Sequence, residues 1–97
     1  MVERKGEFEI GGKMPNEEIR AKILKAAFEA AEEAGGIKVG IFNVYEISKG
    51  WGVEEKRIDF NADYLNEAGL VIWAESGGGM RITATGVEEY ERTRNSE

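Results

Sequence analysis

The chain has 97 residues and a formal net charge of −6, and it contains neither cysteine nor histidine. This length suits one domain, and the two missing residue types exclude disulfides, thiolate or imidazole zinc sites, and nucleophilic sites that need histidine. No apolar run approaches the ~20 residues of a membrane span, and the N-terminal residues lack the apolar core of a signal peptide. We therefore expect a cytoplasmic protein without membrane association, and we identify no catalytic residue, metal site or cofactor.

Residues 1–15 precede the first clear helix. Phe8 and Ile10 alternate with Glu7 and Glu9, which is typical of a weak edge strand, although a loose arm explains the segment equally well. The sequence thus predicts an N-terminal arm or edge strand over 1–15 and one folded domain over 16–97.

Residues 16–34 predict a long helix, with Asn16 as its cap or Pro15 in its first turn, and with Gly35 and Gly36 ending it. Its apolar stripe contains Ile19, Ile23, Ala26, Ala27, Ala30 and Ala34, and Leu24, Phe28 and Ala31 widen that stripe. Such a wide arc needs cover from the arm, the C-terminal helix or another subunit. We predict a homodimer, with Leu24 and Phe28 at its interface.

A brief strand is expected over 37–42, followed by a short second helix that Asn43 caps. The break at 50–52 leads to a third helix, which Gly69 ends. Ile58, Ala62 and Leu65 share the inward face of that third helix, whereas Phe60 points outward.

Two apolar runs around the glycines at 77–79 predict a hairpin with a three-residue loop, in which at least one residue has positive φ. In the expected register, Glu75 lies opposite Arg81. The inward face then holds Leu70, Ile72, Ala74, Met80, Ile82 and Ala84, and the outward face holds Trp73, Glu75, Arg81 and Thr83. Thr85 and Glu88 form a capping box, so a last helix is expected from Gly86, with Val87 and Tyr90 inward.

Two stretches resemble the winged helix-turn-helix superfamily. One is VEEKRIDFNADYLNEAGLVIWAE, in which the third helix runs through an AGL turn into a strand, and the other is MRITATGVEEYE, in which the second strand leads into a last helix. The resemblance covers roughly residues 16–92. It implies an α+β winged helix: a three-helix core, a short strand, a two-stranded β-hairpin wing and a C-terminal helix.

The resemblance also implies double-stranded DNA as the partner, with the third helix in the major groove and the wing on the backbone. By position, the DNA contacts would be Lys56, Arg57, Asn61 and Arg81. The leading functional interpretation is accordingly a DNA-binding transcriptional regulator.

The composition of the third helix favours a second interpretation. Five acidic residues, Glu54, Glu55, Asp59, Asp63 and Glu67, outnumber Lys56 and Arg57 on and beside it, a net of −3 that is unfavourable near phosphates. The alternative is a protein-interaction module that docks its partner through Phe60, Asp63, Tyr64 and Trp73. A positive strip over helix and wing would favour DNA, and an acidic patch around an exposed Phe60 would favour protein.

Overall fold

The computed structural model describes residues 14–95 and has an α+β fold. Its described elements are four α-helices, a 3₁₀ turn and a three-stranded antiparallel sheet. In chain order they are α1 (Asn16–Ala34), β2 (Phe42–Asn43), α2 (Val44–Ile47), η1 (Lys49–Trp51), α3 (Glu55–Glu67), β3 (Val71–Glu75), β4 (Gly79–Ile82) and α4 (Ala84–Asn95). The arm predicted over 1–15 lies, except for Met14 and Pro15, outside the described residues.

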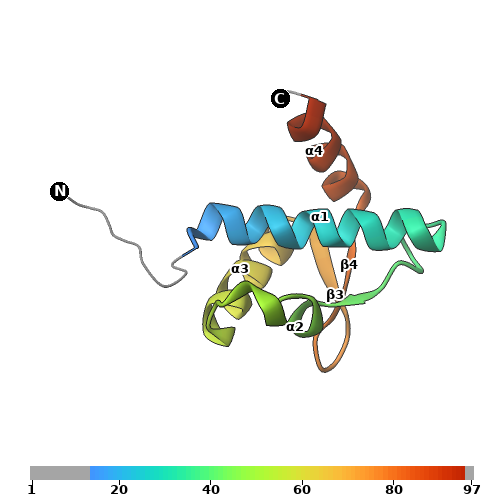
Figure 1. The fold of residues 1–97 in the computed structure, drawn as a ribbon. Helices are drawn as coiled ribbons and strands as arrows, with labels where there is room; N and C mark the ends of the chain where they lie inside the picture. The colour runs from blue at the N-terminus through green and yellow to red at the C-terminus, as the bar shows by residue number, and fades with distance from the viewer. Residues whose placement is uncertain (1–13, 96–97) are drawn as a thin grey trace.

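Helix α1 is the central element of the fold. It contacts α3, β2, β4 and α4, and in Figure 1 it separates α4 from α2, α3 and the hairpin. Its core-facing residues are Ile19, Ile23, Leu24, Ala27, Phe28 and Ala31. The predicted stop is confirmed, since Gly35 has φ 85° and its N–H is bonded to the carbonyl oxygens of Ala31 and Glu32.

Leu24 and Phe28 are covered within a single chain. Their exposed fractions are 8% and 7%, and the ring of Phe28 stacks on that of Tyr90 in α4 with 4.5 Å between centroids. The C-terminal helix is therefore the cover for this flank of α1. The uncovered arc that suggested a dimer through these residues is absent from the structure, and a homodimer stays a prediction.

The chain between α1 and β2 differs from the predicted strand. Only Phe42 and Asn43 pair with β4, whereas residues 37–39 form a turn. The turn brings Gly40 against α1, where a Cβ at Gly40 would lie 2.4 Å from the Cα of Ala31 and 2.8 Å from the carbonyl oxygen of Ala30. The glycine inside the apolar run thus serves a close backbone contact.

The hairpin forms where it was predicted, but its register is different. The structure pairs Ile72 with Arg81, Trp73 with Met80 and, after an irregularity, Glu75 with Gly79. The predicted pairing of Glu75 with Arg81 is wrong because Gly79 belongs to β4, so the loop is 76–78. Met80 is buried as predicted, but the buried residue of β3 is Val71 instead of Ile72 or Ala74.

The glycines of the hairpin loop adopt the backbone conformation expected of them. Gly77 and Gly78 have φ values of 83° and 109°, which L side chains rarely adopt. The tip is also tethered, because the Nδ2 of Asn43 donates to the carbonyl oxygen of Gly77 and the N–H of Val44 donates to that of Gly78.

Helix α4 begins two residues earlier than predicted. Its cap is Thr83 instead of Thr85, since the Oγ1 of Thr83 accepts from the N–H of Gly86 at 2.9 Å. The same hydroxyl donates to the carbonyl oxygen of Gly69. Gly86 lies so near the chain after α3 that a Cβ there would be 2.1 Å from the carbonyl oxygen of Leu70. These contacts direct α4 back across α1, with Val87 and Tyr90 against the core as predicted.

We predict that Gly40→Ala destabilises the fold by at least ~1–3 kcal/mol, because the added methyl group would overlap the backbone of α1. Urea unfolding measures the change. Gly50→Ala is the matched control: a Cβ there meets no atom within 4 Å, so we expect a change within ~0.5 kcal/mol. Equal midpoints for the two variants would contradict the close contact.

Candidate functional site on helix α3 and the hairpin

Two aromatic side chains project from the outer face of α3. Phe60 is 59% exposed and Tyr64 is 51% exposed. They are four residues apart, so they lie next to each other one helical turn apart. The opposite face, with Ile58, Ala62 and Leu65, is buried, so the core sets the direction in which both rings point.

Trp73 extends this aromatic surface from the hairpin. Its indole N–H donates to the Oδ1 of Asp63 at 3.3 Å, and the side chain is 36% exposed. Trp73 pairs with Met80, so its ring shares the sheet face that Met80 turns toward the core. We call Phe60, Asp63, Tyr64 and Trp73 the aromatic face.

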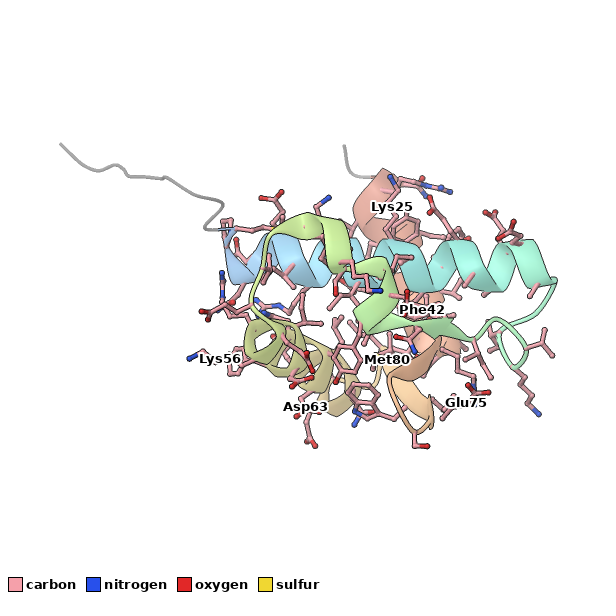
Figure 2. All side chains as sticks on the ribbon, turned by 60° about the horizontal axis from the view of Figure 1, so that its bottom comes forward. Lys25, Phe42, Lys56, Asp63, Glu75 and Met80 are labelled. Atoms are coloured by element: carbon pink, nitrogen blue, oxygen red, sulfur yellow. The ribbon has the colours of Figure 1, made fainter. Side chains whose placement is uncertain are left out.

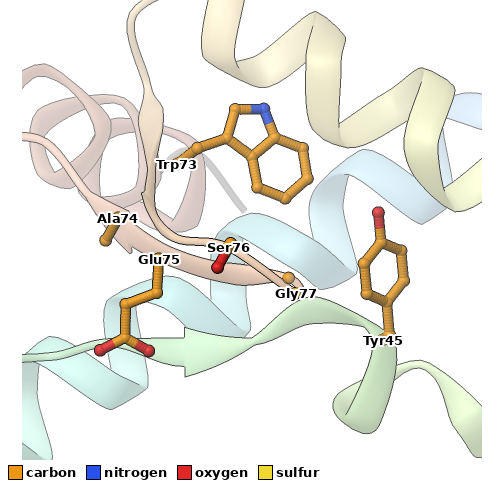
Figure 3. A pocket seen from close by; sticks show the side chains of 7 residues that line it. Tyr45, Trp73, Ala74, Glu75, Ser76 and Gly77 are labelled. Carbon is orange, nitrogen blue, oxygen red and sulfur yellow. The ribbon is translucent and has the colours of Figure 1, made fainter.

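A second contact joins α2 to α3 beside the hairpin tip. In Figure 3 the rings of Tyr45 and Trp73 stand on one side of the tip, both directed toward α3. The hydroxyl of Tyr45 donates a hydrogen bond to the carboxylate of Asp59. An open pocket of about 520 Å³ lies at the hairpin tip, lined by Tyr45, Trp73, Ala74, Glu75, Ser76, Gly77 and Gly78.

The bond to Asp59 is the main reason that the pKa of Tyr45 is raised from 10.0 to about 12. Burial of the hydroxyl and the negative charges of Asp59, Glu55 and Asp63 raise it further. The raised pKa keeps the hydroxyl of Tyr45 protonated and donating above pH 10, where an unperturbed tyrosine ionises.

The four residues predicted to contact DNA do not form one surface. Lys56 is exposed at the outer side of α3, as Figure 2 shows. The neighbouring Arg57 is half-buried and donates from Nη2 to the Oδ1 of Asn16 at 2.8 Å. Arg81 pairs with Ile72, on the opposite sheet face from Trp73, and its Nη1 donates to the carbonyl oxygen of Ile82. The prediction that Trp73 and Arg81 share one face of the hairpin is therefore wrong.

Asn61 is a structural residue in this fold, because its exposed fraction is 0%. Its Nδ2 donates to the Oδ1 of Asn16 and to the carbonyl oxygen of Arg57, and its Oδ1 accepts from the Nη1 of Arg20. The amide is thus fully engaged between α1 and α3. The prediction that it contacts a base is corrected on this ground.

Arg20 joins this buried amide to the aromatic face. Its guanidinium carbon lies 4.1 Å from the ring centroid of Tyr64, in addition to its bond to Asn61. Arg20, Asn16 and Tyr45 are the site residues that the sequence did not reveal. Their partners are separated from them by 14 to 45 positions, and no local motif signals such pairs.

Acidic groups surround the aromatic face. Asp59 and Asp63 lie on α3 itself, and Glu67 ends the helix. Glu75 lines the pocket at the hairpin tip, and in Figure 3 its carboxylate points away from the ring of Trp73. Within residues 14–95 no group of three acidic side chains is arranged to hold a metal ion, and no helix among them is long and apolar enough to cross a membrane.

Comparisons with known proteins return no match for this chain among family models, curated proteins or solved structures.

We predict that Asn61→Ala lowers the free energy of unfolding by about 1–3 kcal/mol, because it leaves the buried partners Asn16 and Arg20 without their amide. Chemical unfolding measures the loss, and Lys56→Ala on the exposed side of α3 serves as the control. Unchanged stability of Asn61→Ala would contradict the structural role.

The hydrogen bond of Tyr45 predicts a pH dependence. Folding raises the pKa of Tyr45 from 10.0 to about 12, so its contribution to stability is complete below pH 10 and is lost as the pH rises toward 12. The parent should exceed Tyr45→Phe in urea midpoint below pH 10, and this advantage should disappear near pH 12. A difference that stays constant with pH would contradict the assignment.

Proposed function

We propose that this protein is a winged-helix domain that docks another protein through its aromatic face. The observation that carries the proposal is the pair of exposed rings, Phe60 and Tyr64, beside Trp73 and among carboxylates. Clustered aromatic side chains of this kind are the usual anchors of protein interfaces. The order of helices, the hairpin and the β2-β4-β3 sheet support the winged-helix part of the proposal.

Two rings of the aromatic face, Tyr64 and Trp73, are held in place before any partner arrives. Arg20 lies over the ring of Tyr64, and Asp63 accepts the indole N–H of Trp73. Side chains already fixed in their bound positions lose less entropy on association. This favours a defined partner surface over an adaptable one.

The charges near the aromatic face define the chemistry of the partner. Asp59, Asp63 and Glu67 give it a negative potential, and the only basic residue of α3 besides the internally bonded Arg57 is Lys56. We propose a partner segment with apolar side chains for the rings and with lysine or arginine around them.

Binding to duplex DNA is the second candidate. It is favoured by the exposed Lys56 and its neighbour Arg57 in the first turns of α3, the end of a recognition helix that contacts bases. The internal bonds of Arg57, Asn61 and Arg81 leave Lys56 as the most accessible of the four predicted contacts. Neither candidate includes a catalytic step.

Phe60→Ala tests the first candidate. The tagged chain is used to isolate a partner from cells of the source organism, and the affinity of that purified partner is then measured by calorimetry. We expect Phe60→Ala to weaken binding by roughly 30-fold, the equivalent of about 2 kcal/mol for an anchor residue. Val39→Ala is the matched control, since Val39 is 63% exposed and lies outside the aromatic face.

The DNA candidate predicts the reverse order of effects. Fluorescence anisotropy with a random-sequence duplex at several salt concentrations gives the affinity and its salt dependence. On the DNA candidate, Lys56→Ala and the double variant Lys56→Ala/Arg57→Ala weaken DNA binding and flatten its salt dependence, by up to about two units of slope for the double variant. Phe60→Ala leaves both the affinity and the salt dependence unchanged. This set of results would contradict docking through the aromatic face.

A further inference from the structure

A second concave surface lies between α1, the C-terminal end of α3 and α4. Its volume is about 620 Å³. Apolar atoms of Leu24, Leu65, Leu70 and Tyr90 line it, together with Ala21 and Ala68. We call it the α1–α4 groove. It lies apart from the hairpin and shares only Tyr64 with the aromatic face.

Basic side chains border this groove in an otherwise acidic chain. Arg20, Lys25 and Arg94 line it, against Glu17 and Glu89, and Glu89 is already paired with Arg92. Long arginine and lysine side chains lay their methylene groups along apolar surface and carry their charge at its edge. The groove therefore suits a segment that is apolar on one side and acidic on the other.

The chain that precedes α1 enters the fold beside this groove. Pro15 accepts the first hydrogen bonds of α1, and Glu17, in the first turn, already lines the groove. From Glu17 to Lys25 the helix advances only ~12 Å. The 13 residues before Met14 can span ~43 Å when extended, so they can turn back and follow the groove along its length.

The sequence of that segment has the required pattern. Phe8 and Ile10 alternate with Glu7 and Glu9, so an extended chain presents both apolar side chains to one side, ~7 Å apart. One turn of α1 advances ~5.4 Å, a similar step. Gly11 and Gly12 follow directly and permit the reversal of direction that docking needs.

We propose that residues 7–10 of this chain dock in the α1–α4 groove, with Phe8 and Ile10 on its apolar floor and with Glu7 and Glu9 near Arg20, Lys25 and Arg94. The segment then covers the flank of α1 that α4 leaves open. This proposal does not depend on the aromatic face or on its partner.

A spin label tests the proposal, because the chain has no cysteine of its own. Lys5→Cys, just outside the docking segment, carries a nitroxide, and amide signals of the ¹⁵N-labelled protein are compared before and after reduction of the label. We expect the amides of Ala21, Leu24 and Thr93 to lose most of their intensity, and those of residues 76–78 at the hairpin tip to keep theirs. In a matched variant that also carries Phe8→Ser and Ile10→Ser, we expect the groove signals to recover.

Two results would overturn docking within one chain. One is a labelled protein whose groove amides lose no more intensity than the hairpin tip, or whose loss persists in the double serine variant. The other result comes from a mixture of spin-labelled chain without ¹⁵N and ¹⁵N-labelled chain without a spin label. If the groove amides lose the same intensity in this mixture, a second copy of the chain occupies the groove.

Discussion

The fold depends on the burial of α1 on more than one side. One 19-residue helix packs against α3, β2, β4 and α4, and glycines permit two close backbone contacts in the fold. Gly40 brings the chain before β2 against the backbone of α1, and Gly86 brings α4 against the carbonyl oxygen of Leu70. Backbone contacts this close leave little freedom in the relative placement of the elements, so the direction of the α3 side chains follows from the packing around α1.

Local signals in the sequence correctly predicted several features of α1, α2 and α3. Asn43 is the cap of α2, with its Oδ1 accepting from the N–H groups of Tyr45 and Glu46, and Gly35 ends α1 as expected. The inward residues of α3 follow from helical periodicity alone. Each of these features depends on residues within about one turn of each other, and for that reason a single sequence suffices.

Features that depend on distant partners were not predictable in the same way. The hairpin register changes with the assignment of one glycine, Gly79, to strand instead of loop. The irregularity between Trp73 and Glu75 then shifts the pairing by one further residue, which moves the buried position of β3 to Val71. Asn61 and the exposed Lys56 are both polar residues of one amphipathic helix. Only the packing of α1 against α3, with Asn16 and Arg20, decides that Asn61 is internal. Outward exposure of Phe60, by contrast, followed from periodicity.

The contact between Tyr45 and the hairpin tip has a consequence for how related sequences can diverge. A Cβ at Gly78 would lie 2.4 Å from the ring of Tyr45 and 2.9 Å from the Oδ1 of Asn43. Tyr45 in turn is bonded to Asp59 of α3. A homologue with a side chain at position 78 therefore needs a smaller side chain at position 45. Without the tyrosine ring, the hydrogen bond to position 59 is lost as well. Positions 45, 59 and 78 should accordingly covary as one unit, and the hairpin tip cannot accept substitutions independently of helix α3.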